Sequence, residues 1–598
     1  MSSGPAQPSR LDTLINWFGA LARWLTGVER RLVGWSEQDG GRGFFIVWLG
    51  VVVTALWLVA TTGMAPIWTY LNDVIVGLDG GWRIFNGQVP GRDFYSVVGP
   101  FSTALLGSGF EWTGGQGIGL PLMMALHGSL LSAVAWYALR DRLSGFWRCV
   151  TCCWLLFLSA GAVPLGLHEG GLTPFHYSTS YAMSYNRTAW STLSLLLLMA
   201  LIPRRARADG VPAGVAGEAM LAGALFALCV FTKINFVCAA CGTFVWMVLW
   251  LPGARGRFVA WSLVGMAAAT AALTVYPGGV TYYFADQWTL MQVDRDESLL
   301  LVLLQKVWWN SSWLAVLGVL YAWVVVAAVV DASPTARREA LRFTLNTLFA
   351  VGMGLFVTIF NFEGPQLPAL VLSGVIIMEL LRRSTAMVVR AERVLVSATV
   401  VLFLVGTHLL VDAGSLVYSW NWKRSAPEAL PRLPGPVLSQ IAAPIRHDEP
   451  RTLPEIDAIL ADRPNDKRYP SVVTSRQLVR WVDDGYALIR RHATPADRVF
   501  TPDWHNPFNL ALDLPPATGG ALHWDIKRMV DDRHHPSPEK TLREITLFMV
   551  PRVTMWQAQR DFMLGIYAPE LARDFDLVEE SPFWSLWRKK MPVATLAP

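Results

Sequence analysis

The stretch from Asp73 to Pro100 combines side chains that can do chemistry with residues that favour turns. It follows directly on an apolar run, 44–64, that is long enough to cross a bilayer. A loop that only joins two membrane helices does not need several carboxylates and arginines, whereas loops that bind or react often carry them. We therefore predict that this stretch is half of an active site at the outer face of a membrane. Its charged residues are Asp73, Asp79, Arg83, Arg92 and Asp93.

Asp73 is the first candidate for a catalytic residue, because it lies soon after the apolar run. A carboxylate at the outer membrane surface can act as a general base and take the proton of an acceptor hydroxyl. The alternative is that Asp73 caps a helix that begins at Val74. Asp79, before Gly80–Gly81, is predicted as a turn residue, and Asp93 as the partner of an arginine. Both are therefore second-choice bases.

The composition of the chain indicates a polytopic membrane protein. Of its 598 residues, 53% are hydrophobic and only 16% are charged, whereas about a quarter of the residues of soluble domains are charged. The apolar residues gather in runs of roughly twenty, the length that crosses a bilayer. The net charge of +5 fits arginines on cytoplasmic loops and gives no argument for nucleic acid binding.

These runs predict an all-α bundle of about eleven transmembrane helices. The loops between them alternate between arginine-rich ones and ones rich in aromatic and acidic residues. The positive-inside rule places the arginine-rich loops in the cytoplasm, so the N-terminus is cytoplasmic and the C-terminal tail lies outside. The predicted spans are 44–64, 117–139, 146–166, 188–203, 215–234, 236–251, 258–277, 308–330, 343–361, 367–381 and 394–412.

Three segments follow from this pattern. Residues 1–43 form a cytoplasmic tail with an amphipathic helix on the membrane surface, 44–412 form the transmembrane domain, and 413–598 form an extracytoplasmic domain. The last segment is rich in charge and proline and mixes helical and strand patterns, so we expect a small α/β domain. Its expected helices lie near 475–493 and 555–567, and its expected strands near 498–501, 546–550, 575–577 and 584–588.

The other outer loops supply the rest of the predicted site. Arg187 and Lys233 lie at the membrane edge, where each either extends its charge to the interface or binds a phosphate. The phosphate of a lipid-linked sugar donor would lie at this level, and Arg92, Arg187 or Lys233 would stabilise its charge. We assign acceptor or sugar binding to polar side chains of the second and fifth outer loops, which are His168, Glu169, His176, Tyr185, Asn186 and Glu363.

Two segments of the tail, 504–508 and 523–525, combine aromatic and histidine side chains. Such rings stack on sugars, and they equally pack one domain against another, so both functions stay open. The adjacent His534 and His535 are too few to form a metal site by themselves.

The first outer loop resembles that of bacterial membrane glycosyltransferases of the GT-C fold, relatives of the protein O-mannosyltransferases and aminoarabinose transferases. The resemblance covers Asp73…Arg83-Ile-Phe-Asn-Gly87-Gln-Val-Pro90-Gly-Arg92-Asp93-Phe94-Tyr95…Gly99-Pro100, with weaker support from Tyr185-Asn186-Arg187.

This resemblance implies a site on the non-cytoplasmic face of a bacterial inner membrane and a soluble outer domain. It implies a polyprenyl-phosphate sugar as donor, a lipid, glycan or protein as acceptor, and Asp73 as the base. Val74 follows Asp73 where many members have Asp-Glu. The choice between Asp73 and Asp79 and the need for a divalent metal therefore stay open.

Three functions are compatible with these features: a glycosyltransferase, a transporter or flippase of a lipid-linked substrate, and a non-catalytic protein of envelope assembly. Transporters place charges near the bilayer midplane and often contain internal repeats. Here the polar residues gather at one face and no repeat is found. We therefore favour the enzyme.

Overall fold

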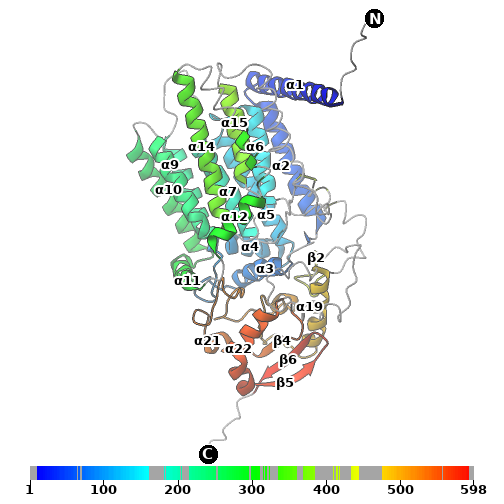
Figure 1. Ribbon diagram of the computed structural model, residues 1–598. Helices are drawn as coiled ribbons and strands as arrows, with labels where there is room; N and C mark the ends of the chain where they lie inside the picture. The colour runs from blue at the N-terminus through cyan, green and yellow to red at the C-terminus, as the bar shows by residue number, and fades with distance from the viewer. Residues whose placement is uncertain are drawn as a thin grey trace, which may run out of the picture.

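Long apolar helices form most of the molecule, as a computed structural model shows (Figure 1). A body of helices carries one helix, α1 (Arg10–Gln38), across one end and a small domain with a sheet at the other. The structure describes residues 10–63, 65–67, 71–160, 181, 184–202, 204, 215–250, 254–294, 298–309, 311, 314–315, 317–319, 322, 334–359, 368–383, 409, 413–414, 417, 420, 432–442, 475–554 and 556–590.

Most of the described apolar runs form helices that overlap the predicted spans, but the helix Leu299–Trp309 ends where the predicted span 308–330 begins. Among the described residues, α2, α5, α8 and α10 are long and apolar enough to cross a membrane. The predicted span 394–412 lies almost wholly outside the described residues, so the total of about eleven spans stays a prediction. The helices of the body are α2 (Arg42–Thr62), α5 (Gly119–Ala138), α6 (Gly145–Ala160), α7 (Ser184–Leu201), α8 (Val215–Thr232), α9 (Asn235–Trp250), α10 (Arg255–Val275), α12 (Leu299–Trp309), α14 (Pro334–Ile359) and α15 (Pro368–Arg383).

One end of the body gathers loops that carry arginines. Arg142 and Arg204 come from two different loops predicted to be cytoplasmic, and both form ion pairs with Glu218 at the start of α8. At the same end, the indole N–H of Trp147 in α6 donates to the carboxylate of Glu29 in α1, at 3.0 Å. Loops that share a predicted side of the membrane therefore meet in space, beside the helix that lies across the body (Figure 1).

The opposite end of the body holds α3 (Leu71–Phe85) and α4 (Pro100–Thr113). The prediction that Asp79 belongs to a turn is wrong, because Gly80 and Gly81 continue α3. Gly81 serves close helix packing instead: a Cβ atom there would lie 2.8 Å from the Cβ of Leu106 in α4. Asp73 lies in the first turn of a helix that already begins at Leu71, so it is not the cap before Val74.

The C-terminal domain contains a four-stranded sheet in the order β3-β4-β6-β5. The first pair is parallel and the other pairs are antiparallel. The helices and strands expected between 475 and 590 are confirmed, although the second long helix extends further than expected. They are α19 (Ser475–Arg490), β3 (Val499–Phe500), β4 (Leu547–Pro551), α22 (Gln557–Asp574), β5 (Phe575–Glu580) and β6 (Trp584–Lys589), with the short helices α20 (Phe508–Ala511) and α21 (Pro538–Leu542).

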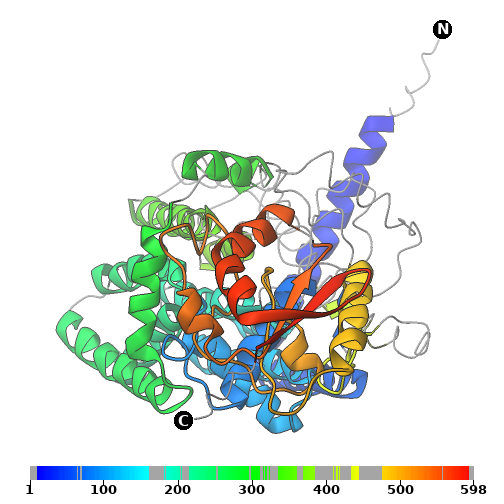
Figure 2. The ribbon, with the colours of Figure 1, turned by 90° about the horizontal axis from the view of Figure 1, so that it is seen from below.

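The C-terminal domain covers the end of the body that holds α3 (Figure 2), and the two share one apolar core. The indole N–H of Trp82 donates to the backbone carbonyl of Leu514 at 2.9 Å, and the side-chain amide of Gln88 donates to the backbone carbonyl of Pro516 at 2.7 Å. A short parallel pair, β1 (Ala65–Pro66) with β2 (Ile441–Ala442), adds a further link. The shared core includes Leu71, Val74, Leu78 and Trp82 of α3 and Leu478, Trp481, Val482, Phe508 and Leu510 of the domain.

Two aspartate–arginine pairs of the first loop offer a matched test of this docking. Asp79 and Arg83 form an ion pair of 2.8 Å with side chains only 2% and 7% exposed, whereas Arg92, paired with Asp93, is 52% exposed. Arg83→Met should destabilise the protein by about 3–5 kcal/mol, because it leaves a buried carboxylate without its cation. Arg92→Met should have little effect, because exposed pairs contribute little. The thermal unfolding midpoint of the full chain measures both, and equal shifts would contradict the docking role of Arg83.

Candidate functional site

The helix α3 places two of its carboxylates on different faces. Successive residues of an α-helix are turned by about 100°, so Asp73 and Asp79 lie roughly 120° apart around the axis. Gly77, one turn after Asp73, faces α7: a Cβ atom there would lie 3.8 Å from the Oγ of the first residue of α7. Gly80, seven residues after Asp73, lies on the same face of the helix as Asp73, and a Cβ atom there would lie 3.4 Å from Leu522 of the C-terminal domain. Asp79 lies on another face and lines a cavity together with residues of the domain. The face of Asp73 therefore meets α7 and the segment of the domain that carries Leu522, whereas Asp79 meets a different part of the domain.

Lys233 meets the start of α7 from the tight turn between α8 and α9. Its Nζ lies 3.2 Å from the Oδ1 of Asn186 and 4.8 Å from the centre of the Tyr185 ring. The first loop runs past this turn, since the N–H of Gly99 donates to the carbonyl of Thr232 at 2.9 Å. We call this group the α3–α7 site, and it comprises Asp73, Tyr185, Asn186 and Lys233.

The α3–α7 site combines a carboxylate with a positioned cation. Asp73 and Lys233 are both half-buried, so each is shielded from bulk water without being sealed off. The amide oxygen of Asn186 and the face of the Tyr185 ring hold the ammonium group in place. A carboxylate in this position can accept a proton, and an ammonium group can bind an anion.

The other predicted charged residues have structural partners. Arg187 donates from Nε and Nη2 to two backbone carbonyls near the end of α6, at 3.0 and 3.1 Å, and so ties α6 to α7. Arg92 binds Asp93 at 2.7 Å on the exposed side of the loop. The contact with Arg92 confirms the prediction that Asp93 is the partner of an arginine. Asp93 also accepts the backbone N–H of Val89 at 2.7 Å.

Several predicted residues lie outside the part of the chain that the structure describes. They belong to the loop between α6 and α7 and to the loop after α14. The first of these loops ends where α7 begins, at the α3–α7 site. Among the described residues, no three His, Cys, Asp or Glu side chains come close enough to hold a metal ion. The predicted residues concerned are His168, Glu169, His176 and Glu363.

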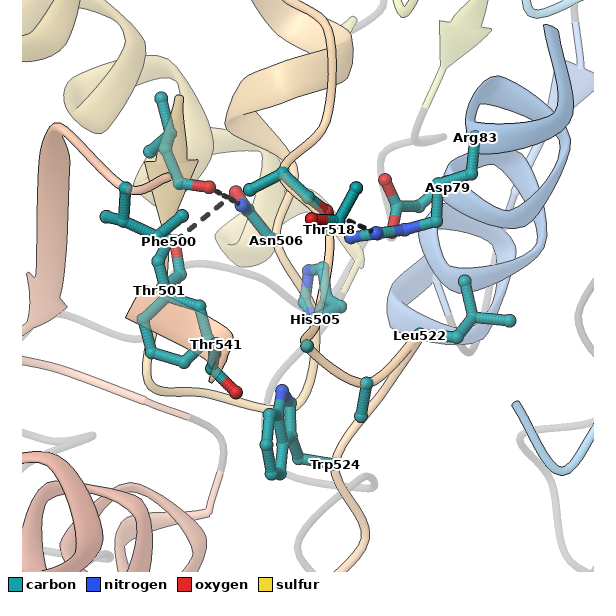
Figure 3. Close-up of a pocket in the computed structure, with 15 residues that line it drawn as sticks. Asp79, Arg83, Phe500, Thr501, His505, Asn506, Thr518, Leu522, Trp524 and Thr541 are labelled. Carbon is teal, nitrogen blue, oxygen red and sulfur yellow. Dashed lines mark hydrogen bonds and ion pairs between the residues drawn. The ribbon is translucent and has the colours of Figure 1, made fainter. Parts of the chain in front are cut away.

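A small cavity lies between α3 and the C-terminal domain and is lined by residues of both (Figure 3). In the close-up, His505 lies between the Asp79–Arg83 pair and the polar side chains of Thr501 and Asn506. Burial raises the pKa of Asp79, and the attraction of Arg83 opposes this shift. Burial lowers the pKa of His505 to about 3, so the imidazole is neutral. Arg83 also donates to the carbonyl of Ala517 at 3.0 Å, which makes Asp79 part of the docking rather than of the α3–α7 site.

The two aromatic–histidine segments of the tail both lie at this contact. Trp504 packs in one cluster with Val76 and Ile84 of α3, so segment 504–508 docks the domain, one of its two predicted functions. In the other segment His523 is buried, with its ring 5.6 Å from that of Trp504. Lys233 is among the charges that lower the pKa of His523. Leu522, the residue before His523, packs against Gly80 on the Asp73 face of α3. The C-terminal domain therefore borders the α3–α7 site, a relation that no local feature of the sequence indicates.

A third carboxylate, Asp286, is buried against the first loop from α11 (Val280–Gln292). Its Oδ2 accepts the backbone N–H of Ser96 at 2.9 Å, and the next residue, Gln287, donates to the carbonyl of Val97 at 3.2 Å. Burial raises the pKa of Asp286 to about 7. An aspartate among aromatic residues of an outer loop is visible in the sequence, but its burial is not.

No protein-family model matches the sequence, and no curated protein matches it. Solved structures that are similar to the chain include two of one protein. One is the crystal structure of ArnT from Cupriavidus metallidurans bound to undecaprenyl phosphate, with 13% identity, a TM-score of 0.43, and coverage of 93% of this chain and 99% of that one. The other is the apo state of the same protein, with 13% identity, a TM-score of 0.40, and coverage of 91% and 98%.

Asp286→Asn should remove a pH dependence of stability. The pKa of Asp286 is raised from 3.8 to about 7, so between these values the folded chain keeps a proton that the unfolded chain releases. The stability of the wild type should therefore fall as the pH rises through this range and level off above it. The variant stays neutral, so its thermal unfolding midpoint should match that of the wild type near pH 4 and exceed it near pH 8.

Asp513→Asn is the matched control, because Asp513 is exposed and its backbone has a φ of 57°, which asparagine tolerates. This control should keep the pH dependence of the wild type. An Asp286→Asn variant that keeps it too would show that another group causes the dependence.

Proposed function

We propose that the protein is a membrane glycosyltransferase that moves a sugar from a polyprenyl-phosphate donor to an acceptor hydroxyl. The observation that carries this proposal is the α3–α7 site, where the Asp73 face of α3 packs against the start of α7 and Lys233 contacts Asn186 in the first turn of α7. A lipid-borne phosphate lies at the surface of a bilayer, so its protein partners must lie where spanning helices end. The resemblance of the first loop to GT-C glycosyltransferases supports the same reaction.

In the proposed reaction, Asp73 takes the proton of the acceptor hydroxyl. The acceptor oxygen forms a bond to the anomeric carbon of the sugar, and the bond from that carbon to the phosphate oxygen breaks. The polyprenyl phosphate leaves with the bonding electrons, and its growing negative charge is stabilised by Lys233. Asn186 and Tyr185 hold that ammonium group before the reaction starts, so little reorganisation is needed.

The same geometry supports Asp73 over the other two aspartates. Asp79 is buried in an ion pair that docks the C-terminal domain, and Asp93 is held by Arg92 and a backbone N–H. A base that must take a proton from a bound substrate needs a carboxylate that the substrate can reach. Asp73, which is half-buried, meets this condition better than Asp79, which is 1% exposed.

The remaining assignments are part of the proposal. The acceptor or sugar contacts Tyr185 and Asn186, together with the predicted residues of the two loops outside the described ranges. Arg187 and Arg92 assist with the donor phosphate. The site faces the outside of a bacterial inner membrane, with the N-terminus in the cytoplasm and the C-terminal domain outside. A lipid, glycan or protein serves as the acceptor.

Asp73→Asn should lower turnover by about 10²- to 10⁴-fold, the usual contribution of a general base. Asp79→Asn should retain turnover per folded molecule, because its amide can still accept a hydrogen bond from Arg83. The measurement is the consumption of a panel of polyprenyl-phosphate sugars by the purified full chain, with the folded fraction taken from thermal unfolding. Loss of turnover in Asp79→Asn alone would move the base to Asp79. A folded wild type that neither consumes nor binds any donor would refute the transferase and favour transport.

A further inference from the structure

A segment of the C-terminal domain is hydrogen-bonded to the first loop next to the α3–α7 site. The N–H of Tyr95 donates to the carbonyl of Gly520, and the N–H of Leu522 donates to the carbonyl of Tyr95, both at 2.9 Å. A few residues further along, Gly99 of the same loop is bonded to the backbone just before Lys233. The first loop therefore runs between the segment that carries His523 and the turn that carries Lys233.

Two cationic side chains, Lys233 and Arg528, act on His523 at this position. Its side chain is only 5% exposed and lies beside the ring of Trp504. Protonation of its ring is opposed by Lys233 at the end of α8, by Arg528 of its own segment and by His505 of the docking loop. Burial is the largest cause of its lowered pKa, which falls to about 3.

One carboxylate offsets part of this positive charge. Asp525 forms an ion pair with Arg528, at 3.1 Å. The guanidinium of Arg528 is 40% exposed, so Arg528 is less shielded from solvent than the buried imidazole. The described contacts of Lys233 include the amide oxygen of Asn186 and the ring of Tyr185. A buried, neutral imidazole next to a positioned ammonium group is suited to an anion, because an anion attracts the ammonium and favours protonation of the imidazole.

We infer that His523 and Lys233 form one phosphate-binding site shared by the C-terminal domain and the helical body. This inference rests on the proposed function, in which the phosphate belongs to the polyprenyl-phosphate donor. The neutral imidazole donates one N–H to a phosphate oxygen. The negative charge of the phosphate then raises the pKa of His523, so that the ring takes up a proton and the hydrogen bond becomes charge-assisted.

Two consequences distinguish this site from a binding site made by the helical body alone. Binding of the phosphate is accompanied by proton uptake, and affinity therefore rises as the pH falls toward the pKa of His523 in the complex. Donor binding also requires that the C-terminal domain be docked, because His523 comes from that domain. A purely structural histidine would produce no proton uptake on binding.

The test is calorimetric titration of the full chain in phosphatidylcholine nanodiscs with undecaprenyl phosphate, in two buffers of different protonation enthalpy. The wild type should bind with net proton uptake. His523→Gln should bind about tenfold or more weakly, as expected for the loss of a hydrogen bond to a charged group, and should lose the uptake. His534→Gln is the matched control, since this histidine of the same domain is paired with Asp531 at 2.9 Å, and it should behave like the wild type.

Lys233→Met tests the same site if His523→Gln fails to fold. Removal of the ammonium group removes its attraction for the phosphate, so the variant should bind more weakly but keep the proton uptake by His523. Wild-type affinity and uptake in either variant would overturn the shared site. So would binding of undecaprenyl phosphate by the wild type without any proton uptake.

A second titration, with inorganic phosphate, separates the two sources of the phosphate group. Binding of undecaprenyl phosphate that depends on His523 supports the lipid donor, whereas His523-dependent binding of inorganic phosphate alone would overturn that assignment. Phosphate binding that depends on His523 in a protein without transfer activity would keep the site and refute the transferase. If the wild type transfers the sugar and His523→Gln binds undecaprenyl phosphate as the wild type does, only the shared site would be refuted.

Discussion

The burial of α3 between the helical body and the C-terminal domain is the constraint on which the rest of the site depends. A helix at the end of a membrane bundle would normally expose one face to water, but α3 is covered on both sides. Its polar side chains must therefore find partners or reach a cavity. Asp79 and Arg83 satisfy this need with each other and with the backbone of the domain. Their pairing sets the rotation of α3 and, through it, the face on which Asp73 lies.

The first loop connects α3 to several other parts of the molecule through hydrogen bonds. Its residues pair with the domain at Tyr95, with α11 at Ser96 and Val97, and with the end of α8 at Gly99. A loop with so many backbone partners can hold groups from three elements at one place, as a reactive site requires. The acidic residues divide accordingly: Asp79 and Asp93 position the backbone, Asp286 anchors the loop, and we assign the proposed chemistry to Asp73.

Much of the architecture could be predicted from residue patterns because bilayer-length apolar runs and amphipathic periods are local properties. The helix at α19 and the strands β4 to β6 follow from such periods. The turn predicted at Asp79 failed for a physical reason. Glycine pairs often mark turns, but glycine also allows two helices to approach, and only the neighbouring α4 decides between these uses.

By itself, the sequence determined that the chain is rich in apolar helices of membrane-spanning length and that polar residues gather between alternate apolar runs, and it singled out the stretch that begins at Asp73. These features depend on hydrophobicity and spacing along one stretch. Only the tertiary structure decided that Asp73 and Asp79 face different neighbours, that Asp286 is buried, and that His523 lies near Lys233. Burial and electrostatic proximity arise from packing between residues distant in the chain, and no local pattern encodes which distant residue will be the neighbour.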